Sequence, residues 1–551
     1  MAAGVPLSLF FGMMVVFVAV TILLGLYGYR NTKNNQQFLL GRNKSNSFII
    51  ALSYGATFLS ASAIIGFGGQ AATHGYALMW LCFLNLFLGL FVAFIVFGKR
   101  VRRAGRRLGA STFSDLLGKL FKSNKIRGFA AAIIIIMMPI YCAAVLKGGV
   151  NTLAVLTGLT DYYNYILIIL AVIVGLYVVY GGIIAVMYND ALQAGVMIIG
   201  MLVILAVTLY AVGGFTAANI ELTEITSGAG TLPGYNNFTE IASFGSAEWW
   251  TVISTFILGV GIGALTQPQL VVRFMSAKDD KMLNRSMIIG SIFIFIIVGS
   301  AYTVGTLTNV YFYDEYGMTS FAYVVQHLGL GVDFIMPQFV LEVFGGISFG
   351  DVFVCIFVLS LLCAAISTLS ALLHTIGTAG GHDVYTLVKN WKARREEEDS
   401  QSLKINRIVT AIVMVLIVVY CYLMPADIIA KATSLFMGLT AAAMLPLMLY
   451  GLYSKDPRKE VALASVTVGT VTYLFWALFI NKGTSIFLPI CKWITGNEVL
   501  FMNSNILYVD ALVVALPLSA LTLVVAFLIM KWRSPKTTGS EIGTGNSKTD
   551  S

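Results

Sequence analysis

The sequence predicts an all-α polytopic membrane protein with about 13 transmembrane helices. Of its 551 residues, 58% are hydrophobic and only 11% are charged, and the mean hydropathy is +0.85. A soluble chain carries about a quarter charged residues. Apolar runs long enough to cross a bilayer recur along the whole chain. These runs lie at 6–29, 46–72, 76–98, 128–155, 163–181, 186–214, 248–272, 285–309, 350–385, 406–424, 428–453, 459–480 and 507–531.

The basic residues predict how the chain is oriented. Clusters of Lys and Arg follow the first, third, seventh, ninth, eleventh and last runs, whereas the long loops at about 215–247 and 310–349 contain neither residue. Because cytoplasmic loops are enriched in Lys and Arg, we expect a cell-membrane protein with its amino terminus outside and its carboxyl terminus in the cytoplasm. The net charge of +9 lies between the spans, so the lipid bilayer is an expected partner and nucleic acid is not.

The chain ends and the cysteines exclude further classes. Leu7–Tyr27 is too long for the apolar part of a signal peptide, and no basic residue precedes it, so we expect a true first span. The polar stretch after Trp532 is expected to be disordered. The six cysteines are scattered and form no CxxC pair, and the four histidines lack ligand spacing, so neither a disulfide framework nor a metal cluster is predicted.

Two of the runs contain residues that favour interrupted helices. Tyr54–Gly69 (YGATFLSASAIIGFGG) and Leu258–Pro268 (LGVGIGALTQP) are rich in Gly, Ala and Ser. Unwound backbone inside a membrane is tolerated only where it faces a cavity or protein. The stretches lie five spans apart, which predicts two inverted halves with a transport site between the breaks. The alternative is ordinary close packing of helices through small residues.

The fourth run contains a lysine. Lys147 follows Tyr141 by nearly two helical turns and would form a cationic pocket with it beside the interrupted helices. An ionisable group inside a span usually marks a pathway. The alternative is that the Lys147 side chain extends toward the headgroups and its ammonium stays in water.

Hydroxyl side chains interrupt the run at 350–385. In Leu361–His374 (LLCAAISTLSALLH), Ser367 and Thr368 are adjacent, and Ala364 lies one turn earlier on the same face. Two hydroxyl oxygens beside a freed carbonyl suit a hard monovalent cation, which prefers oxygen ligands. Alternatively, these hydroxyls bond to carbonyls of their own helix or hold helices together.

Four segments of the chain carry a resemblance to a known family. They are GATFLSASAIIGFGG (55–69), YVVYGGIIAVMYNDALQ (177–193), QPQLVVRFMSAKD (267–279) and CAAISTLS (363–370). In this order and spacing, the chain resembles the sodium:solute symporter family from about residue 34 to 455. The resemblance implies an inverted five-plus-five helix repeat with broken first and sixth core helices, one extra N-terminal helix and two C-terminal helices.

The same resemblance implies a division of the chain into five parts. These are an N-terminal helix and cytoplasmic loop at 1–45, a first five-helix repeat with an outer loop at 46–247, a second inverted repeat at 248–453, two C-terminal helices at 454–532, and a disordered tail at 533–551.

The resemblance also implies the site residues. The family's conserved sodium site matches the backbone oxygens of Ala56 and Leu59 and the set Ala364, Ser367 and Thr368, so a sodium ion is expected as the co-transported ion and no other metal is. Independently of the resemblance, the interrupted stretches and the pocket beside them predict Ser60, Tyr141, Lys147 and Gly261 as solute-binding residues.

Three further residues need comment. Asp190 matches an acidic position that the family places on the ion's cytoplasmic exit path, although it could equally be a carboxylate favoured at a helix entry. Arg273 is expected to be an interfacial anchor at a helix end. The proline carriers of this family have an aspartate at the position of Phe58, and because Phe supplies no oxygen, proline specificity is less favoured.

These observations favour a transporter over a channel or a membrane enzyme. A channel would need a repeated filter sequence or rings of charged residues, and the sequence shows neither. A membrane enzyme would need clustered His or carboxylate residues, and the spans contain almost none. We therefore predict a sodium-coupled symporter that imports a small organic solute by alternating access. Positive half-helix ends and Lys147 favour a carboxylate, either a monocarboxylate or a pantothenate-like acid. The alternative is a proton-coupled or uncoupled carrier of a neutral solute such as a sugar or amino acid.

Overall fold

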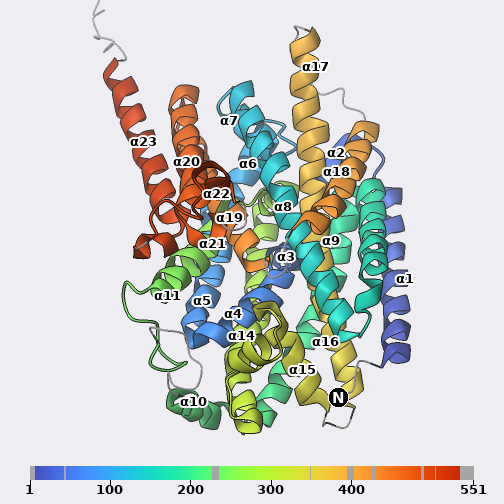
Figure 1. Cartoon of the computed structure of the whole chain (residues 1–551). Coiled ribbons are helices and arrows are strands. Elements are labelled where there is room, and N and C mark those ends of the chain that lie inside the picture. The colour runs from blue at the N-terminus through green and yellow to red at the C-terminus, as the bar shows by residue number, and fades with distance from the viewer. Residues whose placement is uncertain are drawn as a thin grey trace, which may run out of the picture.

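The computed structural model describes most of the chain, and every regular element in the described residues is a helix (Figure 1). The described ranges are 6–41, 45–225, 235–345, 347, 349–393, 403–424, 429–485, 489–502 and 504–533, without the side chains of 390–393 and 429. Apart from Arg533, the predicted disordered tail lies outside these ranges.

Eleven described helical runs are long and apolar enough to cross a membrane, and they correspond to the thirteen predicted spans. The run Thr160–Ala211 contains two spans that meet at Gly182, where the backbone adopts φ +57° and ψ −153°. The run Ser62–Arg107 likewise bends at Gly75, with φ +64°. Its first part continues the short helix Ser47–Phe58 as the second predicted span, and its second part is the third span.

The elements of the first part of the chain end with the short helix α10. They are α1 (Leu7–Asn31), α2 (Asn35–Leu40), α3 (Ser47–Phe58), η1 (Ser62–Gly66), α4 (Phe67–His74), η2 (Gly75–Leu78), α5 (Met79–Leu86), η3 (Phe87–Gly98), α6 (Lys99–Arg107), α7 (Phe113–Leu120), α8 (Asn124–Leu156), η4 (Thr160–Tyr162), α9 (Tyr163–Ala211) and α10 (Phe215–Glu224).

The second half starts with another interrupted helix and ends with a long C-terminal one. Its elements are α11 (Ala247–Trp250), η6 (Thr251–Val260), α12 (Gly261–Gly263), η7 (Ala264–Thr266), α13 (Pro268–Ser276), α14 (Asp280–Tyr316), η8 (Ala322–His327), η9 (Val332–Phe334), α15 (Ile335–Gly345), α16 (Gly350–Thr378), η10 (Ala379–Val384), α17 (Tyr385–Ala393), α18 (Leu403–Leu423), α19 (Ile429–Tyr453), α20 (Lys459–Phe479), α21 (Lys482–Ser485), α22 (Ile490–Thr495), η11 (Asn505–Tyr508) and α23 (Ala511–Arg533).

Both predicted interruptions are present, each with a local cause. The helix α3 ends because Leu59 leaves the helical region, with φ −94° and ψ 88°, and the chain resumes where the N–H of Ser62 donates to the hydroxyl of Ser60 at 3.1 Å. The second break falls at Gln267, which is extended because the following Pro268 disfavours the helical region in the residue before it. Proline then occupies the first turn of α13, where its missing N–H costs nothing.

The glycines before the second break serve close packing, which was the alternative considered from the sequence. A Cβ on Gly261 would lie 2.4 Å from a methyl carbon of Leu84 on α5, and one on Gly263 would lie 2.6 Å from the Cβ of Met437 on α19. Both glycines are within helical turns. They therefore allow α12 to approach two neighbours, and Gln267 and Pro268 produce the break.

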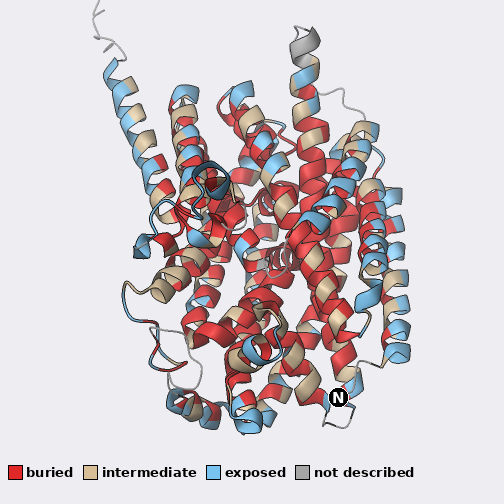
Figure 2. Ribbon diagram, in the orientation of Figure 1, coloured by how far each residue is buried: buried red, intermediate tan, exposed pale blue. Residues whose placement is uncertain are grey.

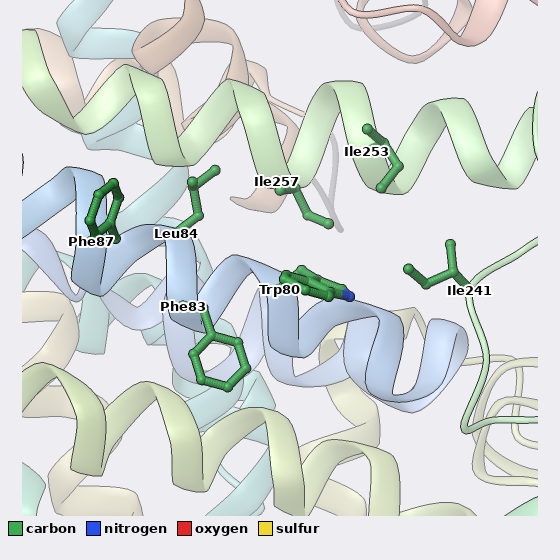
Figure 3. Close-up of a pocket in the computed structure, with 7 residues that line it drawn as sticks. All are labelled: Trp80, Phe83, Leu84, Phe87, Ile241, Ile253 and Ile257. Atoms are coloured by element: carbon green, nitrogen blue, oxygen red, sulfur yellow. The ribbon is translucent and has the colours of Figure 1, made fainter.

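The central helix of the bundle is α16, and peripheral helices face the lipid. Most of α16 is buried (Figure 2), whereas α1, at the edge of the bundle, exposes Val15 and Val16. An apolar groove of about 310 Å³ lies between α5 and η6, and Figure 3 shows its seven lining side chains, among them the exposed Trp80 and Phe83. Exposed aromatic and aliphatic side chains on spanning helices are expected where lipid is the solvent.

One end of the bundle, which we call the basic end, carries α6, α7, α17 and the end of α23 (top of Figure 1). A buried ion-pair network connects three elements there. Asp115 on α7 lies 3.4 Å from Arg127 on α8, and Arg127 lies 3.0 Å from Asp383 in η10. Burial by itself raises the pKa of Asp115, but the hydrogen bond from His382 and the charges of Arg127 and Lys119 outweigh it and hold that pKa below its usual value.

This network also brings Asp115, His382 and Asp383 together with ligand atoms within 4.8 Å of one another. The sequence spacing of the histidines did not reveal this cluster, because α7 and η10 are more than 250 residues apart. Arg127 and Lys119 already supply two positive charges to the two carboxylates. The arrangement is therefore that of a fixed ion-pair network.

We predict that Gly182→Ala lowers the melting temperature, Tm, of the purified protein in detergent. The left-handed backbone at Gly182 costs a residue with a Cβ about 1–3 kcal/mol, and that Cβ would lie 2.9 Å from the carbonyl oxygen of Phe38. The matched control is Gly195→Ala in the same helix, where a Cβ meets nothing within 4 Å. Gly195→Ala should leave Tm unchanged or raise it, and equal losses in both variants would contradict the argument.

Candidate functional site

Two hydroxyls of α16 reach the broken end of α3. The Ser367 hydroxyl lies 3.0 Å from the carbonyl oxygen of Ala56 and 3.1 Å from that of Ala364. The Thr368 hydroxyl donates to the carbonyl oxygen of Thr57 at 3.3 Å. Carbonyls in the last turn of a helix have no N–H partner within it, so these hydroxyls satisfy backbone groups that the break in α3 exposes.

The five residues predicted from the resemblance to bind sodium lie together around this contact. Ala56, Ala364 and Ser367 meet through the Ser367 hydroxyl, Thr368 is the next residue, and Leu59 is the residue at which α3 ends. All five are buried, with exposures of 0–1%. The oxygens that they offer are neutral, either carbonyl or hydroxyl, which is the donor set that a hard monovalent cation prefers.

Asp190 lies next to these residues and accepts hydrogen bonds from four side chains. Its Oδ2 accepts hydrogen bonds from Ser53 at 2.6 Å, from Thr57 at 3.2 Å and from Arg273 at 2.9 Å. Its Oδ1 accepts a longer one, of 3.5 Å, from Ser370 on α16. Because the helix restarts at Gly182, Asp190 lies about two turns inside it. The interpretation of Asp190 as a helix-entry carboxylate is therefore wrong.

The prediction that Arg273 is an interfacial anchor is also wrong. Arg273 is only 1% exposed, and its guanidinium donates to Ser53 at 3.0 Å, to Thr57 at 2.6 Å and to Asp190. Its position at a helix end was read correctly from the sequence. That position does not reveal that α13 packs against α3, which turns the side chain into the bundle where a charge must be paired.

Thr57 and Ser53 are functional candidates that the sequence analysis missed. Thr57 connects the predicted ion-binding residues with the Asp190–Arg273 pair, because its carbonyl accepts a hydrogen bond from Thr368 and its hydroxyl contacts Asp190 and Arg273. Ser53 lies four residues earlier and therefore on the same face of α3. Two hydroxyl residues four positions apart inside an apolar span indicate a polar face on that helix, so the sequence could have identified them.

Two of the four predicted solute-binding residues meet at the break in α3. The Tyr141 hydroxyl on α8 donates to the Ser60 hydroxyl at 3.3 Å, and Ser60 also contacts the hydroxyl of Ser62. The Tyr141 ring stacks on Phe436 of α19, with centroids 5.8 Å apart. Three helices thus converge on a small group of neutral hydroxyls beside the predicted ion-binding residues.

The other two predicted solute-binding residues contact different partners. The Lys147 ammonium donates to the carbonyl oxygen of Met424, at the end of α18, at 2.5 Å. A cation is favourable there because the carboxyl end of a helix carries negative partial charge. Gly261 packs against Leu84. Phe58, where the proline carriers have aspartate, packs against Gly89 of η3 and contributes no oxygen.

We predict that Arg273→Leu lowers Tm strongly, because it leaves Asp190 buried without its cation. Removing one partner of a buried ion pair costs about 3–5 kcal/mol. The double variant Asp190→Asn, Arg273→Leu should recover part of this loss, because no unpaired charge remains. Thermal unfolding of the two single variants and the double variant measures the coupling, and strictly additive losses would contradict a direct interaction.

Comparison with known proteins identifies the family of the chain. The model of the sodium:solute symporter family matches residues 38–469, which is more than half of the chain. The sodium/pantothenate symporter of Haemophilus influenzae is 26% identical over 465 residues, covering 84% of this chain and 89% of that protein. The sodium/proline symporter 2 of Staphylococcus saprophyticus is 25% identical over 484 residues, covering 86% and 87%.

Solved structures share the fold. A Na⁺-coupled sialic acid symporter in a substrate-bound outward-open state superposes with a TM-score of 0.69 at 17% identity, covering 97% of this chain and 99% of that one. A nucleobase-cation-symport-1 family transporter in a closed conformation gives 0.53 at 14% identity, covering 91% and 95%. The all-helical fold with interrupted core helices is thereby confirmed, and the chain belongs to the sodium:solute symporter family, as a sodium-coupled transporter and not an enzyme.

Proposed function

We propose that Ala56, Leu59, Ala364, Ser367 and Thr368 bind the sodium ion that drives import of a small carboxylate solute. The observation that carries this proposal is the contact of the two α16 hydroxyls with the last carbonyls of the broken helix α3. The proposal includes the orientation expected from the basic residues, with the amino terminus outside and the carboxyl terminus in the cytoplasm.

Sodium would act by replacing hydrogen bonds with ion contacts. In the structure the Ser367 and Thr368 hydroxyls donate their protons to carbonyls of α3. A bound cation would draw the same carbonyl and hydroxyl oxygens toward itself, and the hydroxyl protons would turn away. The ion would therefore hold α3 to α16 in one arrangement. A ligand that binds one arrangement better than another shifts the equilibrium between them, and this is how sodium would favour solute binding.

The proposed exit path leads from this site to Asp190 through Thr57. Thr57 touches Thr368 through its carbonyl, and it touches Asp190 through its hydroxyl. Asp190 is a buried carboxylate that bonds Thr57 and Ser370, which adjoin the neutral ion site, so a departing cation would find a favourable position there. Arg273 holds Asp190 in the meantime and would compete with the ion for it, which keeps the cation from being trapped.

The solute would bind beside the ion, at the break where Ser60 and Tyr141 meet. The interrupted stretches contain no Asp or Glu to receive a cationic solute. Pantothenate, proline and sialic acid, which appear in the names of the similar proteins, all carry a carboxylate. A carboxylate would accept hydrogen bonds from the Ser60 and Tyr141 hydroxyls, and the positive partial charge at the amino end of η1 would favour its negative charge. Lys147 is the proposed cationic residue on the approach to this position.

We predict that the double variant Ser367→Ala, Thr368→Ala raises the sodium concentration for half-maximal uptake by about tenfold or more. Each lost oxygen partner costs about 1 kcal/mol, and two such losses multiply. The measurement is uptake in proteoliposomes with sodium replaced stepwise by choline at fixed pH.

The matched control for this prediction is the double variant Ser360→Ala, Thr375→Ala. These hydroxyls lie on the same helix, and each bonds a carbonyl of the preceding turn, Ile356 and Ala371. The control should keep the parent's sodium dependence. An unchanged sodium dependence in the Ser367, Thr368 variant would exclude the proposed ion site.

The last prediction separates two roles of Lys147. If Lys147 helps to select a carboxylate, Lys147→Gln should raise the half-saturation concentration of the solute about tenfold, and Lys147→Arg should keep part of the affinity. If Lys147 only stabilises the end of α18 through Met424, Lys147→Gln should lower Tm and leave solute affinity unchanged. Uptake of proline, pantothenate, short monocarboxylates, sugars and amino acids first identifies the solute. An uncharged solute would refute the carboxylate proposal.

A further inference from the structure

Two apolar grooves flank the first half of α9 on the membrane-facing side of the molecule. The first, of about 450 Å³, lies between α9 and α1 and is lined by Ile22, Leu26 and Ile173 among others. The second, of about 410 Å³, lies between α9 and α18 and is lined by residues such as Val172 and Val415. Figure 1 shows these three helices at one edge of the bundle.

The two grooves are separated by a ridge that both share. Leu176 and Tyr180 of α9 line both grooves, and they are 54% and 50% exposed. Along α9 the second groove extends from Ile168 to Tyr180, a rise of roughly 18 Å. Half of the hydrocarbon core of a bilayer measures about 15 Å, so the groove is about as long as one leaflet is thick.

A positive charge lies at the end of the ridge. Arg407, in the second turn of α18, donates to the carbonyl oxygen of Tyr180 at 2.9 Å. Its guanidinium carbon lies 5.7 Å from the ring centroid of Tyr29 on α1 and 5.6 Å from that of Tyr180. The charge thus lies beside two aromatic rings, one from each of the two helices that border the first groove.

Within the residues that the structure describes, no carboxylate neutralises the charge of Arg407. Its Nε–H is buried and has no hydrogen-bond partner, and no carboxylate in the described part of the chain forms an ion pair with it. Arg30, at the end of α1, adds another exposed basic residue near this end of the bundle. A buried donor without an acceptor costs about 1–3 kcal/mol, which an anionic ligand would recover.

We propose that this surface binds one anionic phospholipid, with its phosphate on Arg407 and one acyl chain in each groove. A guanidinium presents a planar fork of donors that fits a phosphate. Basic pockets between spanning helices are suitable sites for anionic lipid headgroups. The grooves fit the remainder of the lipid, because both are apolar, they lie side by side along α9, and the second is about as long as one leaflet is thick.

A second copy of the chain fits this surface less well. It would have to bring a carboxylate to Arg407, and α1, α9 and α18 contain one acidic residue between them, Asp190, which is buried. The lipid would pack across α1, α9 and α18 near the bend at Gly182, where the Thr32 hydroxyl already donates to the carbonyl of Gly181 at 2.8 Å. Bound lipid should therefore stabilise the folded protein.

The test measures lipid retained by the purified, delipidated protein. The protein is titrated in detergent with dioleoyl phosphatidylglycerol, which is anionic, or with dioleoyl phosphatidylcholine, which carries no net charge. Bound lipid is counted by native mass spectrometry, and Tm is recorded in parallel. We expect about one tightly held phosphatidylglycerol per chain, bound at least about fivefold more tightly than phosphatidylcholine, with a matching rise in Tm.

Two variants test the two halves of the site. Arg407→Gln should abolish the preference for the anionic lipid, and Arg407→Lys should retain part of it. Val172→Trp fills the second groove, keeps the charge and should weaken both lipids alike. The matched control is Arg458→Gln, because Arg458 also donates to a backbone carbonyl, that of Met530, and lines neither groove. It should bind lipid as the parent does.

Three outcomes would overturn the proposal. The first is a lipid count that does not depend on this site, shown either by equal retention of the two lipids by the parent or by undiminished phosphatidylglycerol binding in both Arg407→Gln and Val172→Trp. The second is a rise in Tm with inorganic phosphate equal to the rise with phosphatidylglycerol. It would show that the site binds a free phosphate ion and not a lipid. The third is a dimer that Val172→Trp dissociates without changing the lipid count, which would assign the grooves to a second copy.

Discussion

The helix break at Leu59 is the feature on which much of this structure depends. A helix that stops inside a membrane leaves backbone groups without partners in a medium that cannot supply them. Here the partners come from α16, whose Ser367 and Thr368 hydroxyls bond the carbonyls of Ala56 and Thr57. The helix α16 can supply these partners because it is buried at the centre of the bundle, against α8 and α9. A break satisfied by neutral oxygens is also a place where a cation can take over.

Charge pairing is the second constraint, and it acts next to the first. Asp190 and Arg273 are both buried, and each would be costly alone. Ser53, Thr57 and Ser370 supply further hydrogen bonds to the pair. The network joins α3, α9, α13 and α16. Of these, α3 is the half-helix before the first break, and α13 is the half-helix after the second break. Movement of any one of these helices would therefore change the contacts of the Asp190–Arg273 pair.

Much of the architecture was predictable from the sequence. Every predicted span has a helical counterpart, and both interruptions lie where small residues and Pro268 are concentrated. The motif segments identified the family and, through it, the grouping of Ala56 with Ser367. The glycines of the second stretch were a weaker signal: Gly261 and Gly263 allow close packing, and the break comes from the proline that follows. Small residues favour both close helix packing and helix interruption, so their presence alone does not show which of the two occurs.

Hydropathy and residue type determined, without any structure, that this chain spans a membrane many times and contains two broken helices, because these properties depend on local composition. The partners of its charged side chains were decided only by tertiary packing. Arg273 lies at a helix end in sequence, yet it faces Asp190 because α13 packs against α3. Lys147 bonds Met424 because α8 crosses the end of α18. Such partners come from residues tens to hundreds of positions away, and no local pattern records which of them the fold brings into contact.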